Sequence, residues 1–161
     1  MHKDSRLPQT PGEGLLYGVI ICSVTVIMMT SLNISLNFTG PGTELFLTIL
    51  KALPVFFIIA MAVERFIVHP LVEKLVQKFA GKEDSFNARI LFTVFFTVIG
   101  MSLIMTVIGD FIGHGFNLSP HIFQRFLANW PRNFGLVLLF ELIIAQPLGR
   151  FAMTRLHLSQ K

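Results

Sequence analysis

Two glutamates within long apolar stretches are the residues whose type and position could carry chemistry in this sequence. Glu64 and Glu141 lie 77 residues apart, and each is followed six residues later by a proline, Pro70 or Pro147. An ionised acid at the centre of a membrane helix costs about 2.5 to 3.5 kcal/mol on insertion scales, so such acids usually face a protein interior or a polar crevice. We therefore expect the two acids to form a proton or cation site.

The same two acids have a structural alternative. Six residues of helix rise about 9 Å, which places each carboxylate near one end of its span and away from the membrane midplane. There each acid could anchor a hydrogen-bond network or lie beside a cation, Arg65 or Arg150. A proton site requires an acid that exchanges a proton near neutral pH, whereas a bound cation would keep both acids ionised. The sequence leaves these alternatives open.

A further proline precedes each acid by ten residues, Pro54 in the first case and Pro131 in the second. A proline inside a helix removes one backbone hydrogen bond and can kink the helix. The freed carbonyl could line a cavity, or the kink could serve only the packing of neighbouring helices. We expect a structural role for all four prolines, Pro54, Pro70, Pro131 and Pro147.

The surroundings of the two inner prolines differ. Apolar residues flank Pro54 from Ala52 to Phe56, whereas the segment around Pro131 is polar and carries the sequence's single tryptophan. A cavity or ligand site would use the polar residues of this region, which are Asn129, Trp130, Arg132, Asn133 and Lys51. Trp130 and Arg132 could instead belong to the aromatic and basic belt that membrane proteins place at the interface.

Asp110 follows the third apolar stretch, at the C-terminal end of a predicted helix, where the helix dipole disfavours a negative charge. We expect an ion pair at the outer end of the span, first of all with Arg132, with Arg125 and Lys51 as the other candidates. His114 and His121 are metal-ligand types, but Gly113 and Gly115 argue against the helical continuity that would bring them to Asp110. No metal site, cofactor or enzymatic activity is predicted, because no nucleophile and base or phosphate-binding pattern occurs.

The composition identifies the kind of molecule that must hold these residues. Apolar residues make up 53% of the chain and charged residues only 14%, far below the roughly 25% of soluble domains. Apolar stretches long enough to span a bilayer are predicted at about residues 14–36, 44–68, 90–109 and 120–146, and the second helix is expected to continue as an amphipathic segment towards Gly81. The sequence therefore predicts an all-α membrane protein with four transmembrane helices.

The four helices form two tandem two-helix hairpins, a parallel internal repeat. A gapless alignment at an offset of 77 residues pairs prolines with prolines, Glu64 with Glu141, and Thr25 with Ser102. Prolines and acids are costly in lipid-exposed helices, so their alignment is informative. The predicted organisation is a cytoplasmic N-terminal tail (1–13), a first repeat (14–76), a cytoplasmic connector (77–90), a second repeat (91–153) and a basic cytoplasmic tail (154–161).

The positions of the basic residues predict the orientation of the chain. Ten of the 13 lysines and arginines lie in the two tails, in the middle connector and at the adjoining ends of the spans, while Lys51, Arg125 and Arg132 lie at the opposite ends of the spans. Cytoplasmic segments next to spans carry such an excess. We expect a multi-pass protein of the bacterial cytoplasmic membrane with both termini in the cytoplasm.

Leu50-Lys-Ala-Leu-Pro-Val-Phe-Phe, followed by a helix that ends in His69-Pro-Leu-Val-Glu-Lys-Leu-Val, resembles the small bacterial membrane proteins grouped as domain of unknown function 2798. The resemblance covers both halves. In the second half Gln146-Pro-Leu-Gly-Arg departs from the pattern. The resemblance implies a bacterial inner-membrane protein and brings no established activity.

Two functions from different classes are compatible with these features. The first is a small transporter or exporter of an unknown small molecule, with proton coupling through Glu64 and Glu141. The second is a membrane protein without transport activity that binds or stabilises another membrane protein or the bilayer. The expected partners are the lipid bilayer and a second copy of the chain or another membrane protein. Nucleic acid is not expected, because the basic residues form no single stripe.

Overall fold

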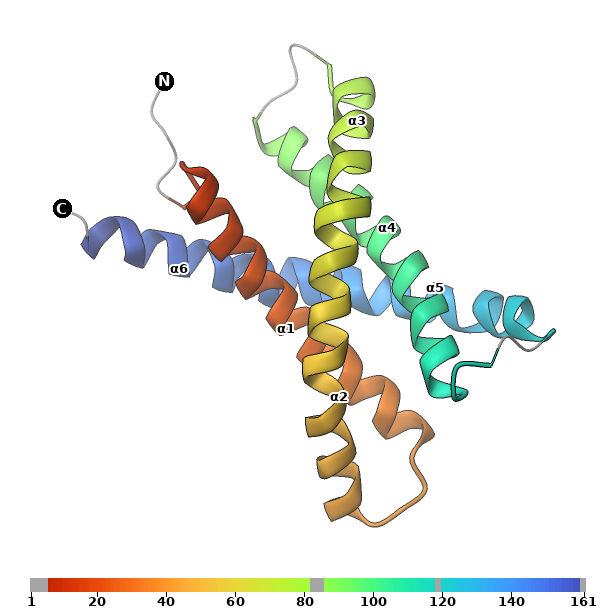
Figure 1. Cartoon of the computed structure of the whole chain (residues 1–161). Coiled ribbons are helices and arrows are strands. Elements are labelled where there is room, and N and C mark those ends of the chain that lie inside the picture. The colour runs from red at the N-terminus through yellow and green to blue at the C-terminus, as the bar shows by residue number, and fades with distance from the viewer. Residues whose placement is uncertain (1–5, 82–85, 118–119, 160–161) are drawn as a thin grey trace. The chain divides into compact units, whose positions relative to one another are not determined.

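The computed structural model describes residues 6–81, 86–117 and 120–159, and every regular element in these ranges is a helix (Figure 1). The remaining residues, which include parts of the predicted tails and connector at 1–5, 82–85 and 160–161, lie outside the described residues. The elements are α1 (Pro11–Asn37), α2 (Gly42–Val63), the π-helix η1 (Glu64–Val68), α3 (His69–Phe79), α4 (Phe86–Gly113), α5 (Ile122–Phe140), the π-helix η2 (Glu141–Ala145) and α6 (Gln146–Ser159).

Four helical stretches are long and apolar enough to cross a membrane, which confirms the predicted multi-pass membrane protein. Two of them, Gly42–Phe79 and Ile122–Ser159, contain 38 residues each. A helix of that length rises about 57 Å, whereas the hydrocarbon core of a bilayer is about 30 Å thick. Each of these stretches therefore continues past the membrane, and the amphipathic α3 is the continuation that the sequence predicts after Val68.

The chain divides into two compact units, and each unit takes helices from both halves of the sequence. Unit 1 consists of residues 1–57 and 139–161, and unit 2 consists of residues 58–138. Unit 1 therefore holds α1 and the first part of α2 together with η2 and α6. Unit 2 holds the end of α2, η1 and α3 together with α4 and most of α5.

In unit 1, α1 packs against η2 and α6 (Figure 1). Ala145 and Met153 are fully buried in this contact region. Gly149 lies so close to α1 that a Cβ atom there would be 2.8 Å from the Tyr17 ring. The small residue therefore allows the two helices to approach.

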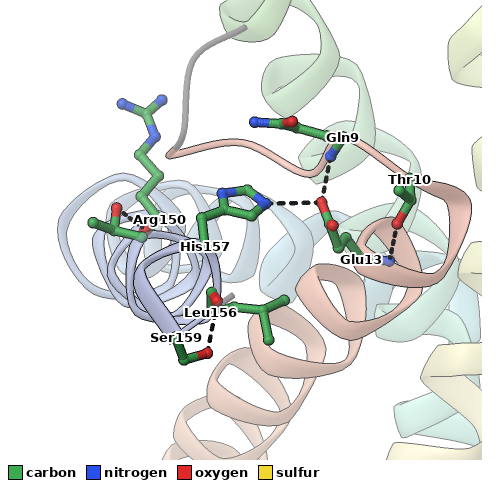
Figure 2. A network of polar contacts seen from close by, with 8 residues as sticks. Gln9, Thr10, Glu13, Arg150, Leu156, His157 and Ser159 are labelled. Atoms are coloured by element: carbon green, nitrogen blue, oxygen red, sulfur yellow. Dashed lines mark hydrogen bonds and ion pairs between the residues drawn. The ribbon is translucent and has the colours of Figure 1, made fainter. Parts of the chain in front are cut away.

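The beginning of α1 is fixed by its own cap and by the last turns of α6. The Thr10 hydroxyl accepts a hydrogen bond from the Glu13 backbone N–H at 3.2 Å, and Pro11 occupies the first helical turn, as is common at helix N-termini. Glu13 in turn accepts a hydrogen bond from the Gln9 N–H at 2.6 Å. Figure 2 shows His157 pointing from α6 to the same carboxylate, with Nε2 3.1 Å from Oε2.

In unit 2, η1 and α3 pack against α4. Val68 is fully buried, and a Cβ atom at Gly100 would lie 3.8 Å from the Val68 Cβ atom. Val63 and Val72 complete the buried cluster, and partly buried residues of α4, among them Met101 and Ile104, cover it. The core of this unit therefore lies between the second helix of the first repeat and the first helix of the second repeat.

Candidate functional site

Glu64 and Glu141 each begin a five-residue π-helix, at equivalent positions of the two repeats. The backbone N–H of the residue five positions later, His69 or Gln146, donates to the carbonyl of the acid. In both copies a proline follows that residue, and its ring would clash with the carbonyl four residues earlier in a regular α-helix. The wider π-turn accommodates the proline, so the helix continues where the sequence suggests that it leaves the membrane.

The carboxylate of Glu141 is buried, with 7% of the residue exposed. It accepts a hydrogen bond from the Thr25 hydroxyl at 3.3 Å and one from the Gln146 side-chain amide at 3.4 Å. The Tyr17 hydroxyl donates to the Gln146 side-chain oxygen at 2.6 Å. Thr25 and Tyr17 belong to α1, so this network joins the first helix of one repeat to the second helix of the other.

The carboxylate of Glu64 has different surroundings. Glu64 is half-buried, and no hydrogen bond or ion pair reaches its carboxylate from within the described ranges. His69 and Arg65 lie near enough to interact with it electrostatically. The His69 imidazole faces Glu73 on α3, with Nε2 3.4 Å from the carboxylate. The two acids are therefore equivalent in the backbone but not in their polar partners.

Ser102, the residue of the second repeat that corresponds to Thr25, forms hydrogen bonds with groups other than Glu64. Ser102 is buried, with 3% exposed. Its hydroxyl donates to the Ile99 carbonyl at 3.1 Å and accepts a hydrogen bond from the Trp130 indole N–H at 3.1 Å. This contact explains part of the difference between the two acids, since Ser102 uses its hydroxyl within α4 and α5.

Three residues of α4, spaced four apart, hold polar side chains of α5. Besides Ser102, Thr106 accepts a hydrogen bond from the buried Asn133 amide at 3.1 Å, and Asp110 binds Arg125. Four residues are slightly more than one turn of helix, so the three lie on one face of α4. The equivalent first-repeat residues at the middle position, Met29 and Phe56, are apolar.

The polar candidates of the region around Pro131 are only partly brought together. Asn133 is buried and bonded to Thr106, and Arg132 lies 3.5 Å from the Asn133 side-chain oxygen. Trp130 stacks on Phe126, with ring centroids 5.8 Å apart. Asn129 is half-buried in the same unit. Lys51 is exposed and belongs to unit 1, whereas the other four residues belong to unit 2.

The predicted ion pair of Asp110 with Arg132 is wrong, because Arg125 is the partner in the structure. Arg125 donates two hydrogen bonds of 2.7 Å, one to each oxygen of the Asp110 carboxylate. Asp110 lies three residues before the end of α4 and Arg125 three residues after the start of α5, so both lie at the short turn between the helices. Arg132 lies seven residues further along α5, about 10 Å away in helix rise.

The pairing also involves His114, one helical turn after Asp110. Its Nδ1 atom lies 2.8 Å from the Asp110 backbone oxygen and 3.5 Å from the carboxylate. His121 is exposed at the start of the following segment. Asp110 and His114 are thus close, as four-residue spacing allows, and Arg125 occupies both carboxylate oxygens.

Sequence reasoning missed the roles of Tyr17, Thr25 and Gln146. A signal for Gln146 exists, because it precedes Pro147 as His69 precedes Pro70. Thr25 is aligned with Ser102, so a hydroxyl is retained at this depth in both repeats. Tyr17 has no comparable signal, since valine occupies the equivalent position 94.

The comparisons with known proteins agree with the internal duplication. The pattern of the domain of unknown function DUF2798 matches residues 10–80 and again residues 85–157. The chain is 29% identical over 147 residues to an uncharacterized protein, YybC, of Bacillus subtilis strain 168, covering 89% of this chain and 91% of that protein. No solved structure matches the chain. With both repeats matched, the chain belongs to the DUF2798 family and carries two tandem copies of its domain.

Proposed function

We propose that this multi-pass membrane protein is a small transporter or exporter in which Glu64 and Glu141 exchange protons or cations. The observation that carries the proposal is the repeated placement of an acid at the first residue of a π-turn inside an apolar helix. Single π-turns occur frequently at functional sites. Ionisable residues inside membrane helices commonly mark ion and proton pathways. The proposal assigns no enzymatic reaction and no cofactor.

Two of the donors at Glu141 are compatible with a change in its protonation state. Thr25 and Gln146 are neutral, and a hydroxyl can both donate and accept a hydrogen bond. When Glu141 is ionised, the Thr25 hydroxyl donates to it. When Glu141 is protonated, its own O–H can donate to the Thr25 oxygen without displacement of either helix. The contact therefore serves both states of the acid.

The difference between the two acids supports a division of roles. Glu141 is enclosed by Thr25 and Gln146, whereas Glu64 is half-buried. We assign the enclosed acid to the proton or cation and the more open acid to a cargo of opposite charge. A lipophilic cation has the chemistry required for that cargo, because Glu64 is an acid within a long apolar helix.

Flux measurements in liposomes test the proposal. The protein is reconstituted with an internal pH dye, and tetraphenylphosphonium is applied as the probe cation under a pH gradient. We expect cation-dependent proton flux in the native chain and its loss in Glu64→Gln and in Glu141→Gln. Glu44→Gln is the matched control, because Glu44 is exposed in the first turn of α2, away from the π-turns. Proton flux that both core substitutions leave unchanged would remove the proposal.

One observation favours the alternative, a membrane protein that binds or stabilises another membrane component. The Glu141 carboxylate joins α1 to η2 and α6 through Thr25 and Gln146, which is also what a structural clamp would do. In that case Glu141→Gln would lower the melting temperature in detergent, and the native chain would show no cation-dependent flux. The two measurements on the same protein distinguish the functions.

A further inference from the structure

The first helix of each repeat packs against the second helix of the other repeat. In unit 1, α1 of the first repeat packs against η2 and α6 of the second. In unit 2, α4 of the second repeat packs against η1 and α3 of the first. The same exchange therefore occurs twice, once in each direction.

At each of these helix contacts, a glycine faces a larger side chain, and the pair of residues differs between the two units. In unit 1, Gly149 receives the Tyr17 ring, and in unit 2, Gly100 receives Val68. At the offset of 77 residues, the counterparts of Tyr17 and Gly149 are Val94 and Val72, which are 8% and 4% exposed. The Gly149 and Tyr17 pair of unit 1 thus corresponds to two valines in unit 2, whereas the counterparts of Gly100 and Val68 are Ser23 and Ala145. In each unit, a glycine of one repeat thus makes room for a larger side chain of the other repeat.

In unit 1, polar contacts also join the first helix of the first repeat to the second helix of the second repeat. Thr25 and Tyr17 of the first repeat reach Glu141 and Gln146 of the second. At the other end of α1, Glu13 reaches His157 (Figure 2). The network around Glu141 therefore cannot form from the second repeat alone.

We infer that the chain is a covalently linked dimer of two-helix units that exchange first helices, so that Glu141 of the second repeat acquires Thr25 as a partner from the first repeat. Within each repeat, the first helix has a surface that packs against the second helix of the other repeat. The partner for this surface is already present in the same chain. The inference is independent of the proposed transport, because it rests on packing alone.

A disulfide across the contact in unit 2 tests the inference on the full chain. The Cβ positions of residues 68 and 100 are 3.8 Å apart, close to the mean separation in disulfides. Val68→Cys and Gly100→Cys are combined with Cys22→Ala, and a protease site replaces residues 82–85, between the repeats. After oxidation in membranes and cleavage, we expect one band of full mass on a denaturing gel, and two half-length bands after reduction.

The matched control replaces Gly100→Cys by Gly109→Cys, since a Cβ atom at Gly109 would meet nothing within 4 Å. This variant is expected to give two half-length bands with or without reduction. Equal cross-linking in both variants, or none in the first, would overturn the inference. Uncleaved cross-linked protein must also run as a single chain. A band of twice the mass would show exchange between molecules and would equally overturn it.

Discussion

Tyr17 orients the side chain of Gln146, and through it the carboxylate of Glu141. The 2.6 Å hydrogen bond from the tyrosine hydroxyl occupies the Gln146 side-chain oxygen. The amide nitrogen of Gln146 is then left to donate towards Glu141. Because an ionised carboxylate only accepts hydrogen bonds, it meets the amide nitrogen of Gln146, while the tyrosine hydroxyl holds the amide oxygen. His69 occupies the corresponding position next to Glu64.

The ion pair of Asp110 with Arg125 links the end of α4 to the beginning of α5. The Asp110 side chain is 7% exposed, and that of Arg125 is 26% exposed. Exposed pairs contribute about 0 to 1 kcal/mol, whereas loss of one partner from a buried pair costs about 3 to 5 kcal/mol. The pair of Asp110 and Arg125 is bidentate but partly exposed, so we expect its contribution to stability to lie between that of an exposed pair and that of a buried pair.

We expect Arg125→Gln to lower the free energy of unfolding in detergent by more than Arg132→Gln does, because Asp110 would lose both charged donors. The fluorescence of Trp130, the only tryptophan, reports the unfolding of α5. Arg132→Gln is the matched control and should change stability by less than about 0.5 kcal/mol, as exposed substitutions usually do. Similar losses in both variants, or the larger loss at Arg132, would contradict the assigned pair.

At the scale of the elements, the π-turns are the feature that the two repeats share most closely. Each has the pattern of an acid, four further residues, a polar residue and a proline, with the acid and the proline aligned at both sites. The extra residue in the turn changes the direction in which the following helix presents its side chains. The packing of Gly149 on Tyr17 depends on that direction.

Pro147→Ala should lower the melting temperature of the protein, although alanine is the better helix former. Without the ring, the π-turn can convert to an α-turn, which rotates α6 by about 100° and moves Gly149 away from Tyr17. Pro131→Ala is the matched control. It lies within the regular helix α5 and should leave the melting temperature unchanged or raise it, since a backbone donor is restored. Equal stabilisation by both substitutions would show that the proline does not maintain the π-turn.

At the scale of the whole molecule, the sequence predicts the four spans and the duplication but not the pairing of the helices. Apolar length and aligned prolines are signals within each repeat, so they locate α1, α2, α4 and α5 within a few residues. They do not locate α6, which continues to Ser159 through residues predicted as a tail. The partner of a helix depends on the side chain that it faces. The sequence does not indicate that Gly100 faces Val68 or that Gly149 faces Tyr17. Thr25 and Ser102 are aligned in the two repeats, yet they bind different partners. For the same reason the sequence does not show that Arg125, and not Arg132, binds Asp110.

The orientation in the membrane is a property of the whole chain, and its basis is the distribution of basic residues. Three lysines and arginines lie at the predicted outer ends. One of them, Arg125, is paired with Asp110, so its charge is largely compensated there. The predicted orientation therefore rests on ten basic residues at one set of ends against three at the other.

Cysteine labelling in intact bacterial cells should place the turns after α1 and α4 outside and the end of α3 inside. In the Cys22→Ala background, we expect a membrane-impermeant maleimide to label Thr39→Cys and Asn117→Cys before permeabilisation. Gln77→Cys and Ser159→Cys should react only afterwards, because positively charged flanks stay in the cytoplasm. Prior labelling with a permeant maleimide controls for the reactivity of each thiol. The reverse pattern would invert the topology, and labelling of Thr39→Cys without Asn117→Cys would contradict the parallel orientation of the two repeats.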